Sequence, residues 1–162
     1  MALSLEEFKS KFGGGVRTNL YEIVIPSLGD LSILAKASTL PNIEIGKIDV
    51  NYAGRILPVP GDRAFAEWAC TIYADEDLSS WKKLKEYHEK YNGFESNTGS
   101  SSAFSGEDIV IKQLKREGEA IVTFTLKNAW CSSVGGWDVS ADNRDAIAEY
   151  STTWQYSHYT IA

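Results

Sequence analysis

The sequence is poor in the residues that most often carry chemistry in proteins. It has 162 residues but only two cysteines and two histidines. Cys70 and Cys131 lie too far apart to suggest a disulfide framework or a zinc motif, and Cys70 falls in an apolar run that favours a buried thiol. Nothing in the local sequence positions His88 or His158 as a catalytic imidazole. We therefore predict no enzyme activity, no metal site and no cofactor.

Long apolar runs and an excess of positive charge are also missing. No segment approaches the roughly twenty apolar residues of a membrane span, and acidic residues stand early in the N-terminus, where a signal peptide would be basic. The 22 acidic residues outnumber the 16 basic ones, which gives a formal net charge of -6. Binding to nucleic acid or to an anionic membrane relies on lysine and arginine instead. We expect no membrane anchoring and no coating of nucleic acid.

Alternating apolar residues, typical of β-strands, are abundant. A spacing of three or four residues occurs only over 78–92, which predicts one amphipathic helix. Because strands and helices do not alternate, the sequence predicts a mainly β fold, an antiparallel β-sandwich or barrel of about seven or eight strands with one α-helix. Hairpins are expected from 20–25 with 31–37 and from 109–114 with 120–126, further strands at 43–60, 67–73 and 149–161, and a loop-rich segment at 127–147.

The chain divides into an arm and one domain. Residues 1–16 are predicted to form an N-terminal arm, in which Phe8 and Phe12 are candidate anchors and the glycines at 13–15 give flexibility. These glycines lack the lysine and the preceding strand of a phosphate-binding loop. Residues 17–162 are predicted to form the β domain. The 43% hydrophobic content of the whole chain is enough for one core.

The segment from residue 43 to residue 60 is the most informative. The apolar parity slips at Gly46, which predicts a β-bulge, and Ala53-Gly54 reverses the chain. Because a positive φ is unfavourable for alanine, we expect a three-residue loop with Gly54 left-handed rather than a type I′ turn. Pro58 and Pro60 fall at sites without a hydrogen bond to the partner strand in either register. They are therefore expected to block strand addition at the outer edge.

The apolar side chains of this hairpin leave two interpretations open. It carries more apolar surface than a free ribbon normally exposes, from Ile48, Val50, Tyr52, Ile56 and Leu57. The hairpin is either an ordinary sheet component with a guarded edge or a projecting ribbon that packs on a neighbouring copy. Periodicity alone does not separate the two.

Two further patterns have both a structural and a functional interpretation. Asp75-Glu76-Asp77 resembles paired acids for glycoside hydrolysis, but these residues precede the predicted helix, where acidic residues complement the helix dipole. The five tryptophans and eight tyrosines would suit a carbohydrate-binding β-sandwich module that stacks sugars on aromatic rings. Packing in the core and in interfaces is favoured for them, because they are spread over several strands.

Several stretches together carry a family resemblance. They are Arg17-Thr-Asn-Leu-Tyr21, Lys36-Ala-Ser-Thr-Leu-Pro41, the run from Ile48 to Arg63, Phe65-Ala-Glu-Trp-Ala-Cys-Thr-Ile72 and the late segment 130–138. These stretches resemble the tail tube proteins of contractile-tailed bacteriophages of the T4 type. The resemblance runs from about residue 17 to the C-terminus, and the Gly61-Asp62-Arg63 step after the hairpin is its most specific part.

The resemblance implies a structural subunit of hexameric rings that stack into a hollow tube inside a contractile sheath. On the family's pattern, strands from all subunits of a ring form an inner β-barrel. DNA and the tape-measure protein pass through the lumen without specific binding, and the sheath, baseplate and tail-terminator proteins are partners. The protein would be part of the virion, assembled in the host cytoplasm. A tube protein of a phage-tail-like contractile injection particle is the nearest alternative, and a carbohydrate-binding module is the alternative from another class.

The resemblance also suggests where copies meet, namely the hairpin, the arm 1–16 and parts of the loop 94–106. The residues expected at contacts between subunits or rings are Ile48, Val50, Tyr52, Arg55, Ile56, Leu57, Val59, Asp62, Arg63, Phe8 and Phe12. Glu44, Asp49 and Glu67 are candidates for an acidic lumen wall, because negative charge there would repel DNA at close range. The sequence does not tell which face of the strands lines the lumen.

Overall fold

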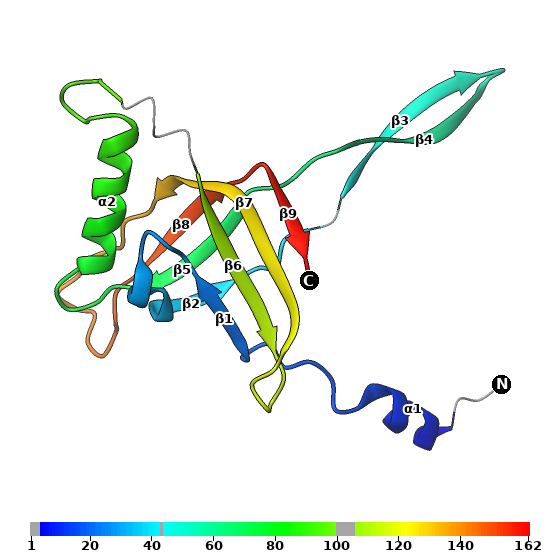
Figure 1. Ribbon diagram of the computed structural model, residues 1–162, viewed down its shortest axis with the longest axis horizontal. Helices are drawn as coiled ribbons and strands as arrows, with labels where there is room; N and C mark the ends of the chain where they lie inside the picture. The colour runs from blue at the N-terminus through cyan, green and yellow to red at the C-terminus, as the bar shows by residue number, and fades with distance from the viewer. Residues whose placement is uncertain (1–3, 43, 100–105) are drawn as a thin grey trace.

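Strand β7 joins the two sheets of the fold (Figure 1). The computed structural model describes residues 4–42, 44–99 and 106–162. Within them, β7 (Ala120–Val134) pairs along its first part with β6 (Glu107–Leu114) on one edge and with β9 (His158–Ile161) on the other. Its second part pairs with β8 (Glu149–Gln155). All these pairings are antiparallel, so the predicted antiparallel, mainly β fold is confirmed.

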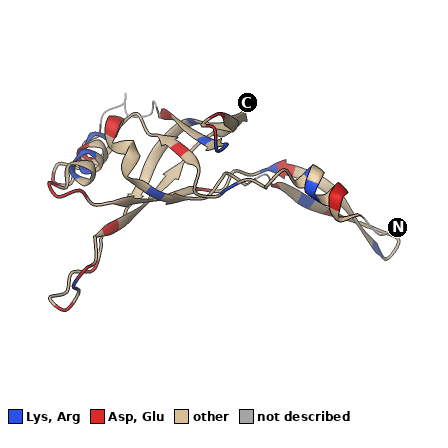
Figure 2. Cartoon of the chain, turned by 90° about the horizontal axis from the view of Figure 1, so that it is seen from below, with Lys and Arg blue, Asp and Glu red and all other residues tan. Residues whose placement is uncertain are grey.

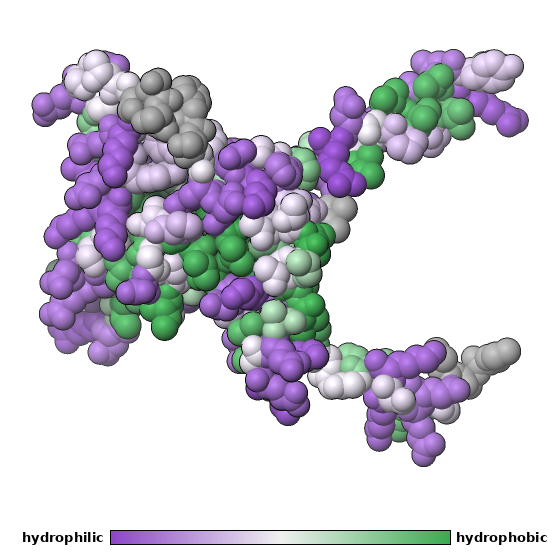
Figure 3. All heavy atoms as spheres, in the orientation of Figure 1, coloured by the Kyte–Doolittle hydropathy of each residue, from purple (hydrophilic) through white to green (hydrophobic). Residues whose placement is uncertain are grey.

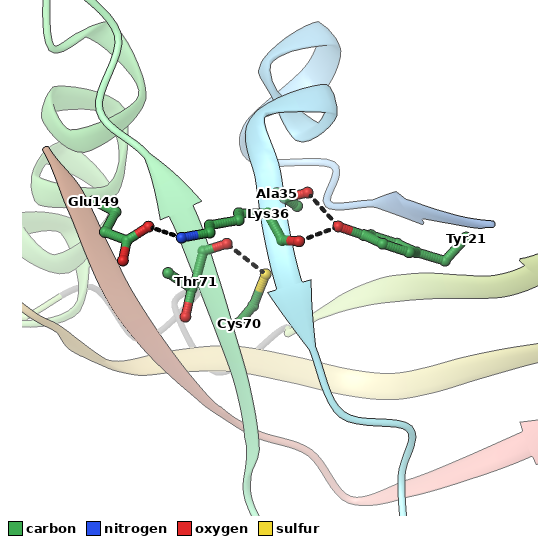
Figure 4. A network of polar contacts seen from close by, with 6 residues as sticks. All are labelled: Tyr21, Ala35, Lys36, Cys70, Thr71 and Glu149. Atoms are coloured by element: carbon green, nitrogen blue, oxygen red, sulfur yellow. Dashed lines mark hydrogen bonds and ion pairs between the residues drawn. The ribbon is translucent and has the colours of Figure 1, made fainter. Parts of the chain in front are cut away.

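We call the strands on either side of this junction sheet A and sheet B. Sheet A contains β1 (Tyr21–Val24), β6, the first part of β7, and β9. Sheet B contains the second part of β7, then β8, β5 (Trp68–Tyr73) and β2 (Ala35–Ser38). The end strands β1 and β2 do not pair, so the sheets form a sandwich and not a closed barrel. Figure 4 shows the Tyr21 hydroxyl bridging these ends by donating to the Ala35 carbonyl oxygen at 3.0 Å.

The core lies between the inner faces of sheets A and B, where the alternation predicted for 67–73 and 149–155 is confirmed. The Trp154 indole N–H donates to the Thr152 hydroxyl at 3.0 Å, and that hydroxyl donates to the Cys70 carbonyl oxygen at 3.0 Å. The buried polar atoms of Trp154 and Thr152 are thus paired, as burial of polar groups requires. The side chains that β5 and β8 bury are Trp68, Cys70, Ile72, Tyr150, Thr152 and Trp154.

Helix α2 (Ser79–Tyr91) covers one end of the sandwich and confirms the helix predicted at 78–92 (Figure 1). Asp75 caps it, because its carboxylate accepts hydrogen bonds from the backbone N–H groups of Ser79 at 2.9 Å and Ser80 at 3.2 Å. The hydroxyls of both serines donate to the same carboxylate. These bonds, foremost the one from the Ser79 hydroxyl, hold the pKa of Asp75 well below its usual range. Asp75 therefore has the helix-terminal role that the sequence favoured.

The predicted hairpin between 20–25 and 31–37 is wrong. Residues Gly29–Leu34 form a 3₁₀ helix, η1, and only Ala35–Ser38 are extended. The buried Ser32 closes this turn, since its hydroxyl donates to the Gly29 carbonyl oxygen at 2.7 Å and accepts from the Ile25 N–H at 3.0 Å. Strand β1 then pairs with β6, and β2 pairs with β5. Local alternation does not reveal that two neighbouring short strands belong to different sheets.

Three other features of the secondary structure differ from the sequence expectation. The strand predicted at 120–126 continues to Val134, so part of the segment expected to be loop-rich belongs to β7. The predicted run 149–161 is interrupted between β8 and β9, because the first pairs with β5 and β7 and the second with β7 alone. The arm contains an additional helix, α1 (Leu5–Phe12), which begins with a capping box between Ser4 and Glu7.

Candidate assembly surfaces

A two-stranded ribbon with many exposed apolar residues projects from the body (Figures 1 and 3). It consists of β3 (Ile45–Tyr52) and β4 (Arg55–Arg63), which pair with each other and with no other described strand. Every residue of both strands is exposed except the half-buried Gly61. Of the two interpretations that the sequence left open, the projecting ribbon fits this geometry.

The turn of the ribbon differs from the expected three-residue loop. Tyr52 pairs directly with Arg55, which leaves a two-residue turn of Ala53 and Gly54. Both turn residues have positive φ, 48° at Ala53 and 79° at Gly54, the combination of a type I′ turn. The expectation was wrong because the match between this turn and the right-handed twist of the strands outweighs the steric penalty at alanine.

The prolines of the ribbon lie where the sequence predicted. The register places Pro58 opposite Asp49 and Pro60 opposite Lys47. Counted from the pair that flanks the turn, these positions make no hydrogen bond across the ribbon. Their ring nitrogens therefore face outward, and the outer edge of β4 has no N–H groups there for another strand.

A bulge is present at the level of Gly46, but its extra residue lies in β4 and not in β3, where the parity slip predicted it. The pairing shifts between Ile45 and Lys47, and Gly61 and Asp62 of β4 together face Gly46. A Cβ atom on Gly46 would lie 3.0 Å from the Asp62 carbonyl oxygen, so the close approach of the two backbones favours glycine. Asp62 and its neighbour Arg63 thus lie at the base of the ribbon, away from its tip.

The ribbon has one apolar and one polar face, because residues directly opposite each other in an antiparallel pair point to the same side. The apolar face consists of the pairs Ile48–Val59 and Val50–Leu57 and ends at the tip with Tyr52–Arg55. The polar face consists of the pairs Lys47–Pro60, Asp49–Pro58 and Asn51–Ile56. The expected contact residues of the ribbon therefore lie on its apolar face, except for Ile56 on the polar face and for Asp62 and Arg63 at the base.

Aromatic side chains hold the base of the ribbon to the body. The Trp68 indole N–H donates to the Thr39 carbonyl oxygen at 2.9 Å, and the Tyr159 hydroxyl donates to the Asn42 carbonyl oxygen at 3.1 Å. Phe65 packs edge-on against Tyr159 with ring centroids 5.5 Å apart. Both connections of the ribbon are therefore fixed to the sandwich.

The arm presents a second exposed apolar surface. The rings of Phe8 and Phe12 stack with centroids 5.3 Å apart, and α1 buries no residue. Positive φ at each glycine from Gly13 to Gly15 bends the chain between α1 and β1. The two phenylalanines are 58% and 56% exposed, so within one subunit they leave an apolar surface open to contact.

The outer face of sheet B is polar and made largely of small side chains. Lys36 of β2 forms an ion pair with Glu149 at 2.5 Å (Figure 4). Its ammonium lies 5.4 Å from the centre of the Tyr73 ring. The hydrogen bond to Glu149 raises the pKa of Lys36. The residues that β5 and β8 place side by side on this face are Ala69 with Thr153, Thr71 with Ser151, and Tyr73 with Glu149.

The three acidic candidates lie in different places. Glu67 precedes β5 at the rim of the outer face of sheet B, where it accepts a hydrogen bond from the Gln155 side-chain amide at 3.0 Å. Asp49 lies on the polar face of the ribbon in an ion pair of 3.0 Å with Lys47, and Glu44 precedes β3. One subunit does not bring them into a single wall. Of the other expected contacts, positions 1–3 and 100–105 lie outside the described residues.

The cysteines and histidines show no catalytic arrangement in the part of the chain that the structure describes. Both cysteines are buried free thiols, as predicted for Cys70, and burial raises the pKa of each to about 12. Burial also lowers the pKa of His88. Among the described residues, no group of potential ligands is suited to a metal ion, and no helix is long and apolar enough to cross a membrane.

The tryptophans mainly pack inside the subunit. Trp68 and Trp154 are buried in the core, and Trp81 of α2 packs edge-on against Trp137 with ring centroids 6.3 Å apart. Trp130 is 43% exposed. This distribution gives no row of exposed rings of the kind on which a sugar chain would stack.

Known proteins similar to this chain are phage tail tube proteins. The family model described as phage tail tube protein matches residues 5–162. A tail tube protein of Serratia phage KSP90 is 26% identical over 166 residues, which cover 94% of each chain. Tail tube protein gp19 of Enterobacteria phage T4 is 26% identical over 144 residues, which cover 87% of this chain and 88% of that protein.

Solved structures with the same fold come from an anti-feeding prophage and from an extracellular contractile injection system. A chain of the tube-terminating cap of the anti-feeding prophage matches with a TM-score of 0.70 and 17% identity, covering 100% of this chain and 94% of that one. A chain from the extended sheath–tube complex of an extracellular contractile injection system matches with a TM-score of 0.69 and 15% identity, covering 99% of each. At these identities the likeness establishes the shared fold.

The fold and its exposed surfaces define a structural protein. The chain belongs to the phage tail tube protein family. It is a tail tube subunit of the type found in contractile phages and related injection systems, and so a component of the tail. The family resemblance seen in the sequence is confirmed, and the members that it matches are structural proteins rather than enzymes.

Proposed function

We propose that copies of this protein form hexameric rings, which stack into the hollow inner tube of a contractile tail through which DNA reaches the host. One observation carries the proposal beyond family membership, namely the ribbon with an apolar face that its own subunit leaves exposed. Apolar surface of this kind is stabilised when a second protein covers it. A repeating tube supplies that second protein as another copy.

Sheet B offers edges for closing a ring. It ends at β2 on one side. On the other side, the part of β7 beyond Ala129 lies past the described pairing with β6. Pairing between β2 of one subunit and the end of β7 in the next would be a head-to-tail contact, which closes when the rotation fits. Repeated around a ring, it would yield the continuous inner barrel that the family resemblance implies.

The outer face of sheet B suits the wall of a channel for DNA. Its hydroxyl side chains, Thr71, Ser151 and Thr153, provide neither a stacking platform nor a cationic groove. Glu149 neutralises Lys36, and Glu67 adds negative charge at the rim. Phosphates would be repelled within a Debye length of about 8–10 Å. DNA and the tape-measure protein would therefore pass without specific binding.

The proposed partners follow from the complexes in which similar folds occur. Those complexes are a sheath–tube assembly, a tube-terminating cap and a baseplate. We extend these roles to this chain, with the sheath outside the tube and the terminator and baseplate at its ends. In this proposal the arm, residues 1–16, and the domain, residues 17–162, are separate assembly elements, and Phe8 and Phe12 contact a neighbouring subunit.

Negative-stain electron microscopy of the purified protein tests the proposal. Rings or tubes are the expected result. A protein that stays monomeric at high concentration and does not assemble with its sheath or baseplate would overturn it. Replacing Asn51–Arg55 with a short turn should give a folded subunit that no longer polymerises, whereas unchanged tubes would show that the tip is not a joint.

A tube of a phage-tail-like particle without a genome is the second candidate. The two solved folds described above come from an anti-feeding prophage and an extracellular contractile injection system, although the curated relatives at higher identity come from phages. The genes around this one distinguish the two, because a phage needs capsid genes and an injection particle does not. Neighbouring capsid genes would support DNA delivery.

A further inference from the structure

We infer that the tip of the ribbon docks into the loop between β7 and β8, residues 135–148, of a second copy of this chain. The inference rests on the proposed stacking of copies and names the surface that receives the ribbon. The occupant of the loop is the Tyr52–Arg55 turn of the next subunit.

The topology places the ribbon and this loop at opposite ends of sheet B. The ribbon leaves the sheet between the end of β2 and the start of β5. At that end Trp68 pairs with Trp154, whereas at the far end Tyr73 pairs with Glu149, the first residue of β8 after the loop. A contact between opposite ends of identical subunits is head-to-tail, and it continues from copy to copy as a stack.

The loop surrounds an open hollow of about 740 Å³. Trp137 fixes its first part, with its ring centroid 6.3 Å from that of Trp81 in α2 and 6.2 Å from that of Tyr150 in β8. Val139 and Ile147 line the same hollow and are 86% and 73% exposed. Aliphatic side chains this exposed, beside an anchored aromatic ring, form a surface that a partner would cover.

The tip of the ribbon has the complementary chemistry. Tyr52 is 77% exposed and stands beside Arg55 at the end of the apolar face, followed by Leu57 at 60%. Tyrosine and arginine are enriched among the residues that dominate binding energy in interfaces. The narrow two-residue turn lets these side chains lead into a hollow.

The charges of the tip and the loop are opposite. The loop carries Asp138, Asp142 and Asp145 with Arg144 as its single basic residue. Figure 2 shows an acidic loop projecting at one end of the molecule and the ribbon extending at the other. Charge complementarity of this kind steers association and sets orientation, while the apolar contacts contribute most of the affinity.

A second apolar hollow, between α2 and β7, fits the tip less well. It is lined by Trp81, Phe94 and Val134 but also by Lys85, whose ammonium lies 5.8 Å from the centre of the Phe94 ring. Arg55 would meet a like charge there. The charge pattern therefore favours the loop 135–148.

Paired cysteines test the docking. Each copy would carry Ala53→Cys at the tip and Ile147→Cys in the loop, and assembled protein would be oxidised with diamide, quenched with N-ethylmaleimide and denatured. If the tip of one copy lies in the loop of the next, disulfides should link successive copies into a ladder on a non-reducing gel. The native Cys70 and Cys131 should not interfere, because both are buried with pKa values raised to about 12.

The matched control combines Ala53→Cys with Ile33→Cys. The Ile33 side chain is 87% exposed but lies in η1, outside the loop. A ladder only from the loop pair supports the inference. Assembled tubes with no ladder, or with equal ladders from both pairs, would overturn it and leave the proposed function standing. Wild-type protein that forms neither rings nor tubes would overturn both.

Reversing the charges of the tip and of the loop gives a second test, measured as the rate of tube formation. Arg55→Glu should slow tube formation at low salt about tenfold, because it removes the attraction between tip and loop. Adding Asp142→Lys and Asp145→Lys in the same chain should restore a large part of the rate. A slow single variant that the loop substitutions do not rescue would overturn the pairing of these two surfaces.

Discussion

The ribbon and strand β5 follow each other in the sequence, and both are amphipathic, but they use their apolar faces differently. In β5, Trp68 and Ile72 are buried inside the subunit. In the ribbon, Val50 and Leu57 remain exposed. The alternation is the same in both regions. The difference is that a second layer of the same chain covers β5, whereas the ribbon extends beyond that layer.

This difference separates folding from assembly. Burying a large apolar side chain contributes about 1.5–3 kcal/mol. For β5 that free energy is gained when the subunit folds. For the ribbon it would be gained only when copies associate, so it depends on protein concentration. The prolines at the outer edge of β4 then have a clear use, because they limit edge-to-edge pairing before the correct contact forms.

The largest effect on folding is expected from Trp154→Ala. Trp154 is fully buried, and its indole N–H donates to the Thr152 hydroxyl. Its removal leaves a cavity and takes away the hydrogen bond that the Thr152 hydroxyl accepts, so the free energy of unfolding should fall by about 3–5 kcal/mol. Chemical denaturation of the unassembled subunit measures this. A variant as stable as the wild type would contradict the core described here.

The apolar face of the ribbon should respond in the opposite way. Val50→Asp should abolish tube formation in electron micrographs, yet change the free energy of unfolding by only about 0.5 kcal/mol, because the residue is exposed in the subunit. Asn51→Asp is the matched control, since it adds the same charge on the polar face and should still allow tubes. If both variants lost assembly equally, the distinction between the two faces would be wrong.

The sequence predicted the features that depend on local pattern. Alternation located the buried residues of β5 and β8, the spacing of three or four located α2, and the parity of Pro58 and Pro60 located the guarded edge. Features that depend on distant partners were not predictable in this way. Whether 35–38 pairs with 21–24 or with β5 is decided by packing across the whole sandwich.

The assembly surfaces also combine features that local sequence predicts with features that only the three-dimensional structure reveals. The excess of apolar residues in the ribbon was visible in the sequence, but its two faces became clear only with the register, which depended on the turn at Ala53-Gly54. Nearly all of the segment 135–148 was predicted to be loop-rich, but its sequence did not indicate a docking surface, because Val139 and Ile147 are isolated in a polar stretch. Their exposure together in one hollow appears only in three dimensions.

A smaller effect, confined to the body, is expected from Asp75→Asn. The pKa of Asp75 is lowered in the folded protein, chiefly by the hydrogen bond from the Ser79 hydroxyl. Its contribution to stability is therefore fully present above the unfolded pKa of about 3.9 and lost as the pH falls through the folded value. The amide has one acceptor oxygen where the carboxylate has two, so the variant should lose about 1 kcal/mol at pH 7. It should also show a flatter decline between about pH 5 and pH 2 than the wild type. Denaturation curves across this range that run parallel would contradict the role of Asp75 as a charged cap.

The smallest effect is expected at the junction of the two regions, where Tyr159→Phe removes one hydroxyl. The variant keeps the ring beside Phe65 and Phe124 but loses the hydrogen bond to the Asn42 carbonyl oxygen, which lies near solvent. The free energy of unfolding should change by about 0.5 kcal/mol. Tube formation followed by light scattering should slow about twofold, the factor that corresponds to this energy, because the ribbon would be oriented less firmly relative to sheet B.

Tyr156→Phe is the control. The ring centroid of Tyr156 lies 6.4 Å from that of Tyr159, but the Tyr156 hydroxyl bonds no residue among those described. Equal rates for both variants and the wild type would mean that packing alone orients the ribbon, and that the base of the ribbon belongs energetically to the core.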